Sequence, residues 1–144
     1  MVAVTTPREL DLLAQKAMLQ GRACLINFFQ DDCYACRSLH TKLKKLAHDH
    51  PDVLFLKVNG SIEAMRPVFE KHGITKVPYF FCLRHGRILS RFSASLNPEK
   101  LAMLRKELVA ALHATAEEEA EEQRPQHAEH APAALELEPA VVAA

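Results

Sequence analysis

The segment from Phe28 to Arg37 reads FFQDDCYACR and contains two cysteines, Cys33 and Cys36, separated by two residues. It follows an almost continuously apolar run and opens a run in which leucines recur at helical spacing. A strand that leads into a helix here would place both thiols on one helical turn, close enough to bridge each other. The unpaired N–H groups and the positive dipole end of a helix N-terminus favour thiolate over thiol. Because the thiolate attacks disulfides, the segment predicts a site of thiol–disulfide exchange.

The patterns around this segment predict an α/β domain. Apolar runs typical of strands alternate with stretches of helical periodicity, and the chain turns at His85-Gly86 between the last two runs. Such alternation favours three layers, with a central mixed sheet of four to five strands that ends in an antiparallel hairpin and is flanked by four helices. The predicted strands cover residues 2–4, 23–29, 53–58, 79–83 and 87–92, and the predicted helices cover 6–21, 34–50, 61–73 and 97–112.

Several helix ends carry their own signals. Thr6 precedes Pro7, Asn97 precedes Pro98, and Ser61 stands before the third helical stretch, so each is a candidate cap. Gly21 follows the last residue of the first helical pattern and should end that helix.

Charge divides the chain into two parts. Residues 1–113 hold 17 basic and 10 acidic residues, whereas residues 114–144 hold one basic residue and eight acidic ones. We therefore expect one domain over 1–113 and an acidic tail over 114–144, rich in Ala, Glu and Pro. The tail should be helical at first, stop at Arg124-Pro125, and then be disordered. It is either solvated or folds over the basic surface of the domain.

The remaining patterns argue against other classes of protein. No stretch approaches the roughly 20 apolar residues of a membrane span, and the chain shows no secretory or transit segment. The basic cluster at 42–45 lacks the interleaved aromatic residues of a nucleic-acid site. We expect a monomer without a cofactor, a membrane contact or a nucleic-acid partner.

The other cysteines and the histidines offer weaker candidates. Cys24 and Cys82 lie in apolar runs, where cysteine behaves as a small hydrophobic residue, and a regulatory thiol is the alternative. Cys33, Cys36 and His40 could ligate zinc together with His48 or His50. Structural zinc sites usually combine two such pairs and this chain has one, so we expect no metal.

These motifs together resemble the thioredoxin family. The resemblance covers about residues 2–112 and rests on the Cys33–Cys36 pair, on the order of strands and helices, and on Lys76-Val77-Pro78 at the start of a strand. Residues 39–92 more narrowly resemble the plant and algal atypical Cys/His-rich, or lilium-type, thioredoxin-like proteins. That resemblance implies a thioredoxin fold and a plastid protein that exchanges disulfides with partners such as 2-Cys peroxiredoxins; without it, a cytoplasmic location would be expected.

The resemblance also implies roles for individual residues. Cys33 corresponds to the attacking cysteine and Cys36 to the resolving cysteine. Pro78 corresponds to the family's cis-proline, which lies against the cysteine pair and leaves the Val77 backbone able to pair with an extended substrate segment. The alternative for Pro78 is an ordinary proline at the start of a strand.

The sequence departs from the family pattern beside the first cysteine and between the two cysteines. Asp32 stands where the family usually has Trp, and Tyr34-Ala35 replaces Gly-Pro. Cysteine pairs at helix starts commonly lower the pKa of the first thiol from about 8.5 to about 7 or below, and thioredoxin is itself a known example. Here Asp32 should oppose that shift, while Arg37 and Lys57 should support it.

A third departure concerns the proton of the second cysteine. Asn27 occupies the position of a buried aspartate, whereas Lys57 matches the lysine that partners this aspartate in the family. Since an amide cannot act as a carboxylate base, we expect resolution by Cys36 to depend on Lys57 or water. The alternative for Asn27 is a hydrogen-bonded polar group in a buried strand.

Two functions fit these features. The first is a protein-disulfide oxidoreductase that cycles Cys33 and Cys36 between dithiol and disulfide and receives electrons from a thioredoxin reductase or glutathione. The second is a thioredoxin-fold adaptor whose basic face or acidic tail recruits partners.

Overall fold

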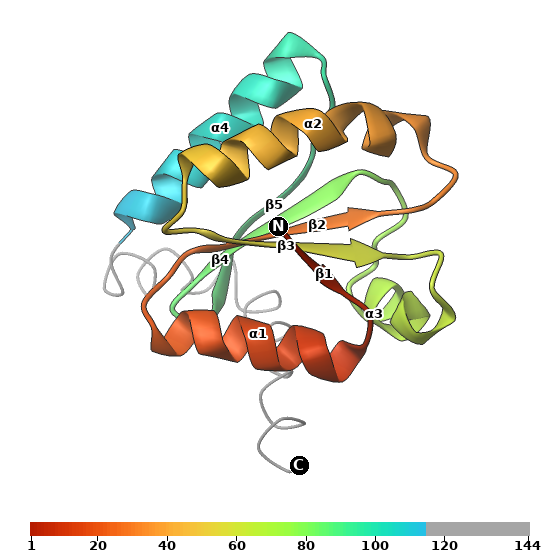
Figure 1. Ribbon diagram of the computed structural model, residues 1–144, viewed down its shortest axis with the longest axis horizontal. Coiled ribbons are helices and arrows are strands. Elements are labelled where there is room, and N and C mark those ends of the chain that lie inside the picture. Colours follow the sequence, from red (N-terminus) through yellow and green to blue (C-terminus); the bar gives the residue numbers. More distant parts are fainter. Residues whose placement is uncertain (115–144) are drawn as a thin grey trace.

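A five-stranded mixed sheet lies at the centre of the computed structural model, which describes residues 1–114 (Figure 1). Its strands are β1 (Val2–Val4), β2 (Cys24–Phe29), β3 (Leu54–Asn59), β4 (Tyr79–Arg84) and β5 (Arg87–Ser93). The helices are α1 (Pro7–Leu19), α2 (Tyr34–Asp49), the short 3₁₀ helix η1 (Glu63–Met65), α3 (Arg66–Lys71) and α4 (Pro98–His113).

The strand order is β1-β3-β2-β4-β5, which puts β2 in the middle of the sheet. β1 and β2 run parallel to β3, while β4 runs antiparallel to β2 and β5 antiparallel to β4. The predicted mixed sheet with a terminal hairpin is confirmed. β2 has a strand on each side and helices on both faces of the sheet. This burial explains why its sequence is almost continuously apolar.

Helices cover both faces of the sheet, as the three-layer prediction required. In Figure 1, α2 and α4 lie above the sheet and α1 and α3 below it. Side chains alternate along β2, so Ile26 and Phe28 join the core cluster beneath α1 and α3, whereas Leu25 joins the cluster beneath α2 and α4. By the same alternation Asn27 lies on the α2 side, the side that carries the cysteine pair.

Most of the predicted helix ends are confirmed. Thr6 Oγ1 accepts a hydrogen bond from the Glu9 N–H at 3.1 Å, and Asn97 Oδ1 accepts one from the Glu99 N–H at 2.9 Å. Gly21 follows α1 with a φ of 66°. The prediction for Ser61 was wrong, because no helix begins directly after it: η1 starts at Glu63 without a side-chain cap.

The described part of the chain ends just after α4. This helix stops at His113, and Ala114 has extended backbone angles. The expected helical stretch before Arg124-Pro125 and the rest of the acidic tail lie outside the described residues. Within residues 1–114, no helix has the length and apolar character needed to cross a bilayer.

Candidate active site

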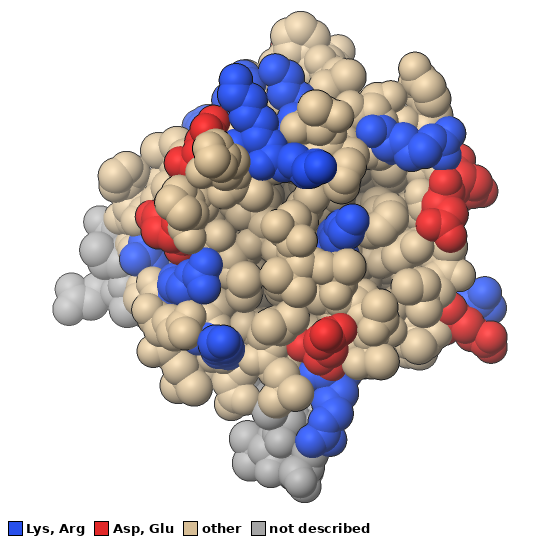
Figure 2. All heavy atoms as spheres, viewed as in Figure 1, with Lys and Arg blue, Asp and Glu red and all other residues tan. Residues whose placement is uncertain are grey.

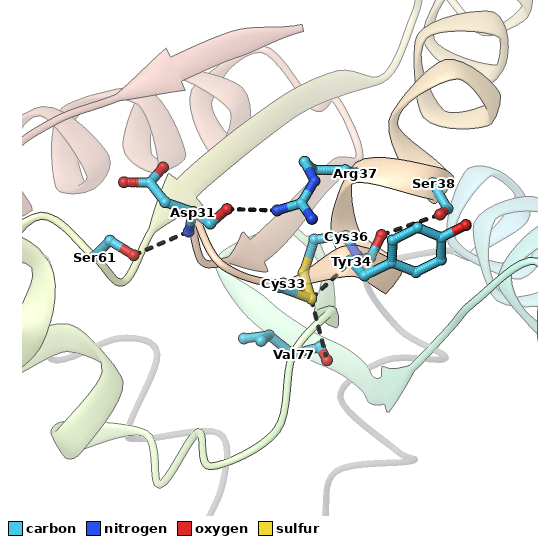
Figure 3. Close-up of a disulfide and its surroundings, with 8 residues drawn as sticks. All are labelled: Asp31, Cys33, Tyr34, Cys36, Arg37, Ser38, Ser61 and Val77. Atoms are coloured by element: carbon cyan, nitrogen blue, oxygen red, sulfur yellow. Dashed lines mark hydrogen bonds between the residues drawn. A yellow bond between two sulfur atoms is a disulfide. The ribbon is translucent and has the colours of Figure 1, made fainter.

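The structure joins Cys33 and Cys36 in a disulfide at the start of α2, with 5.2 Å between their Cα atoms (Figure 3). Cys33 is the N-cap residue, and its Sγ accepts a hydrogen bond from the Cys36 N–H at 3.1 Å. Leu39 and Leu43 are fully buried on the inner face of α2 and fix this helix on the sheet. The helix therefore holds the sulfur of Cys33 among the N–H groups of its first turn.

The two cysteines differ in exposure. Cys33 is half-buried, whereas Cys36 is 5% exposed. Tyr34, between them, points away from the disulfide and is 76% exposed. Cys33 is therefore the more accessible cysteine of the pair.

The backbone before β4 lies against the disulfide. Val77 O is 3.8 Å from Cys33 Sγ, and the Val77–Pro78 peptide bond is cis, as the resemblance implies (Figure 3). The ladder between β2 and β4 ends at the pair Phe28–Tyr79, so the Val77 backbone lies beyond the paired residues. Val77 is half-buried beside the sulfur, whereas Pro78 is buried.

The loop before Cys33 is fixed by polar contacts that sequence reasoning missed. The Asp31 N–H donates to Ser61 Oγ at 2.9 Å, and the Asp31 carboxylate accepts a hydrogen bond from Asn59 Nδ2 at 2.9 Å. Asn59 Oδ1 in turn accepts a hydrogen bond from the Ser61 N–H. The predicted strand order could have indicated these contacts. Because β2 and β3 are parallel neighbours, the residues that follow them meet at one edge of the sheet.

Arg37 and Asp32 lie on either side of the cysteine pair in the sequence. The Arg37 guanidinium donates to the Asp31 carbonyl at 2.8 Å, and it points along the loop in Figure 3. It therefore braces the backbone before Cys33 as well as adding positive charge nearby. Asp32 is exposed.

A pocket of about 270 Å³ opens beside Cys36 on the α2 side of the sheet. The Asn27 side chain lines it; the residue is 5% exposed, and its Oδ1 has no hydrogen-bond partner among residues 1–114. The Lys57 ammonium lies 6.0 Å from the centre of the Phe29 ring at the same pocket. The pocket residues are Asn27, Phe29, Gln30, Asp31, Cys36, Arg37, His40 and Lys57.

His40 contributes a titratable imidazole group to this pocket. Its pKa lies below the ordinary 6.5, first because partial burial disfavours the charged ring and then because Lys57, Lys44 and the N-terminal amino group add positive charge. A neutral imidazole therefore stands one helical turn from Cys36.

Cys24 and Cys82 are free thiols remote from exchange chemistry. Both are buried, and they belong to core clusters on opposite faces of the sheet. Burial raises the pKa of each thiol to about 12. Neither provides an accessible thiolate at neutral pH. No cluster of three or more His, Cys, Asp or Glu side chains within residues 1–114 is arranged to hold a metal ion.

Figure 2 shows where charge gathers on the viewed face of the domain. Lys and Arg side chains collect over α2, the helix that contributes Arg37, Lys42, Lys44 and Lys45. The excess of basic residues predicted for residues 1–113 thus includes the helix that begins at the disulfide.

Known proteins are similar to this chain in sequence. Thioredoxin-T of Drosophila melanogaster is 30% identical over 95 residues, which cover 65% of this chain and 59% of that protein. The chloroplastic thioredoxin-like 2-2 of Arabidopsis thaliana is 36% identical over 84 residues, covering 57% of this chain and 34% of that protein. The chain thus matches less than two thirds of the length of either relative.

Solved structures confirm the thioredoxin fold. A thioredoxin of Fasciola hepatica matches with a TM-score of 0.65 at 28% identity, over 74% of this chain and 98% of its own. A poplar thioredoxin h matches with a TM-score of 0.70 at 24% identity, over 79% of this chain and 97% of its own. The family model described as Thioredoxin matches residues 3–107, and with this match the chain belongs to the thioredoxin family.

Proposed function

We propose that this protein is a thiol–disulfide oxidoreductase that exchanges the Cys33–Cys36 dithiol or disulfide with protein substrates. The observation that carries the proposal is the disulfide at the N-terminus of α2, in which Cys33 is half-buried and Cys36 is buried. This arrangement separates a sulfur that can meet a substrate from a sulfur that can complete the reaction.

In the first step the Cys33 thiolate attacks one sulfur of a substrate disulfide. A bond forms between Cys33 and that sulfur, the substrate disulfide breaks, and the other substrate sulfur leaves as a thiolate that takes a proton from solvent. The N–H groups at the start of α2 support the attacking thiolate, since the Cys36 N–H already points at Cys33 Sγ. The Val77 backbone, 3.8 Å from that sulfur, offers a pairing edge for an extended substrate segment.

In the second step Cys36 attacks the sulfur of Cys33. The Cys33–Cys36 disulfide forms, the mixed disulfide breaks, and the second substrate sulfur leaves reduced. Two electrons pass from the protein to the substrate, and the reverse sequence oxidises a substrate dithiol. The Cα separation of 5.2 Å lies within the range that a disulfide requires.

Disulfide reduction by Cys variants tests the proposal. With insulin as substrate and dithiothreitol as reductant, the native chain should accelerate precipitation of the insulin B chain. Cys33→Ser should abolish this activity. Reduced Cys36→Ser, mixed with insulin after the dithiothreitol has been removed, should accumulate a mixed disulfide with the substrate, detected on non-reducing gels. Cys82→Ala is the matched control, because it removes a buried thiol remote from the site, and it should retain activity.

The adaptor alternative gives the opposite pattern. If partner capture by the full chain is unchanged in both Cys33→Ser and Cys36→Ser, and insulin reduction is absent in the native chain, the exchange function is rejected.

We further infer a role in redox regulation in the plastid, with 2-Cys peroxiredoxin as a substrate. The support is the resemblance of residues 39–92 to plant and algal atypical thioredoxins, together with similarity to chloroplastic thioredoxin-like proteins. The reduced chain, mixed in equal amounts with oxidised 2-Cys peroxiredoxin, should convert the peroxiredoxin dimer to monomers on non-reducing gels. Reoxidised chain should regain its thiols from thioredoxin reductase or glutathione; if neither works, a different donor is required.

A further inference from the structure

The buried cysteine poses a problem of proton transfer. Before Cys36 can attack, its thiol must become a thiolate, and the residue is 5% exposed. Asn27 lines the pocket beside it, but an amide does not accept this proton. Lys57 lines the same pocket and, as an ammonium group, carries donors and no acceptor.

We propose that His40 is the base that receives the Cys36 proton when Cys36 attacks the mixed disulfide. The proposal builds on the exchange function described above, and it assigns to an imidazole on α2 the task that neither Asn27 nor Lys57 performs.

Position supports this assignment. Cys36 and His40 are four residues apart on α2, so their side chains lie on the same face, with Cβ atoms about 5–6 Å apart. Both line the pocket of about 270 Å³, which has room for a bridging water. His40 is half-buried and Cys36 is buried, so the pocket forms a route from the thiol through the imidazole to solvent.

An unpaired acceptor in the pocket adds an independent observation. Asn27 Oδ1 is buried and has no hydrogen-bond partner among residues 1–114. A buried amide oxygen without a donor is costly, and a water that links the thiol to the imidazole would supply one. Asn27, Cys36 and His40 all line this pocket.

The environment of His40 keeps its imidazole in the neutral form, which can accept a proton. Partial burial lowers the pKa of His40, and so do the positive charges of Lys57 on β3, Lys44 on its own helix and the Met1 amino group just before β1. Arg37 and Asp31 line the pocket with it and carry opposite charges. At neutral pH the imidazole is therefore uncharged, with a proton on only one of its two nitrogens. After it has taken the proton of Cys36, the same positive charges favour release of that proton to solvent.

The step balances in protons and electrons. Cys36 loses its proton to an imidazole nitrogen of His40, and the resulting thiolate forms a bond to the Cys33 sulfur. The bond between Cys33 and the substrate breaks, and the substrate sulfur leaves with the electron pair. The imidazolium then passes its proton through the pocket to solvent, where the leaving thiolate can take it up.

Separate observation of the two exchange steps tests the proposal. Reduced protein in fivefold excess is mixed with 5,5′-dithiobis(2-nitrobenzoate) in a stopped-flow instrument, and release of the coloured thiolate is followed. The first release reports attack by Cys33, and the second, independent of protein concentration, reports attack by Cys36. General-base catalysis typically contributes about 10²–10⁴-fold. Since water replaces part of this, His40→Ala should slow the second release at pH 7 by about tenfold or more and leave the first within about twofold.

The pH profile and a rescue exclude a merely structural role. In the native chain the second rate should level off above the lowered pKa of His40, whereas in His40→Ala it should keep rising towards the pKa of the thiol. Asn27→Asp, added to His40→Ala, places a carboxylate in the same pocket and should restore the second release. His48→Ala removes an exposed histidine farther along α2 and should change neither phase.

The outcomes separate this inference from the proposed function. If the native chain releases both thiolates and His40→Ala does so at the same rate with the same pH profile, the assignment of His40 is wrong and the exchange function stands. If the native chain never gives a concentration-independent second release, Cys36 does not resolve, and the proposed function itself fails.

Discussion

At the scale of single residues, the environment of each cysteine decides its reactivity. Cys33 sits among helix N–H groups with access to solvent, whereas Cys24 and Cys82 are buried with thiols whose pKa is raised to about 12. When the reduced native protein is treated briefly with iodoacetamide at pH 7, we expect Cys33 to be alkylated first and faster than free cysteine. Mass spectrometry after proteolysis gives the modified positions.

A denatured sample is the control for this experiment, because unfolding should expose all four cysteines to similar labelling. Labelling of Cys24 or Cys82 in the folded protein at the rate of Cys33 would contradict the burial of these thiols.

The dipeptide between the cysteines should set the redox potential. Ala35 retains a backbone N–H on the first turn of α2, which a proline at this position lacks. That donor can stabilise the Cys33 thiolate, and a hydrogen bond to a charged group contributes about 1.5–3 kcal/mol. We therefore expect a potential less negative than the roughly −270 mV of thioredoxin.

Ala35→Pro tests this reasoning. It should make the potential more negative by about 30 mV, which corresponds to about 1.4 kcal/mol for a two-electron couple. Ala35→Gly keeps the N–H and is the control. Equilibration with glutathione buffers measures both potentials, and a shift of equal size in the two variants would rule out the missing donor as the cause.

At the scale of elements, the turn after β3 connects the core to the active-site loop. Gly60 lies between Asn59 and Ser61, which hold Asp31, and a Cβ at Gly60 would approach Phe69 Cζ to 2.7 Å. The Phe69 ring is buried and packs edge-on against Phe28, so it cannot move freely. Gly60→Ala should therefore lower the free energy of unfolding by about 1–3 kcal/mol, as measured by urea denaturation.

Gly73→Ala is the matched control, because this glycine has a φ of 63° and no neighbour near an added Cβ. It should cost about 1–2 kcal/mol from backbone strain alone. Phe69→Leu should relieve the crowding in Gly60→Ala but leave Gly73→Ala unaffected. Additive losses for Gly60→Ala and Phe69→Leu would contradict the proposed contact.

The same elements show what a sequence can and cannot predict. The apolar runs, the Thr6 and Asn97 caps and the turn at His85-Gly86 are local signals, and the structure contains all of them. The prediction of Ser61 as a helix cap was wrong because its hydroxyl oxygen accepts a hydrogen bond from the Asp31 N–H, 30 residues away in sequence. The sequence indicated His40 only as a possible zinc ligand. Its pocket is formed jointly by α2, β2 and β3, so it is visible only in the folded chain.

At the scale of the whole molecule, two buried ionisable groups should oppose each other as pH changes. Burial lowers the pKa of His72 from 6.5 to about 4, and burial raises the pKa of Asp11 from 3.8 to about 6. Below pH 6.5 the unfolded chain binds a proton at His72 that the folded chain refuses until about pH 4, so stability falls with acidification. Above pH 3.8 the unfolded chain releases a proton at Asp11 that the folded chain keeps until about pH 6, so stability falls as pH rises.

Because these two contributions have opposite slopes between about pH 4 and pH 6, the native protein should show a shallow profile there. His72→Gln leaves the Asp11 contribution, so the free energy of unfolding should decrease from pH 4 to pH 6.5. Asp11→Asn leaves the His72 contribution, so it should increase over the same interval. In each variant the free energy of unfolding, measured by urea denaturation, should change by roughly 1–2 kcal/mol over this pH interval. Profiles with the same sign in the two variants would show that other titrating groups control the acid stability of the domain.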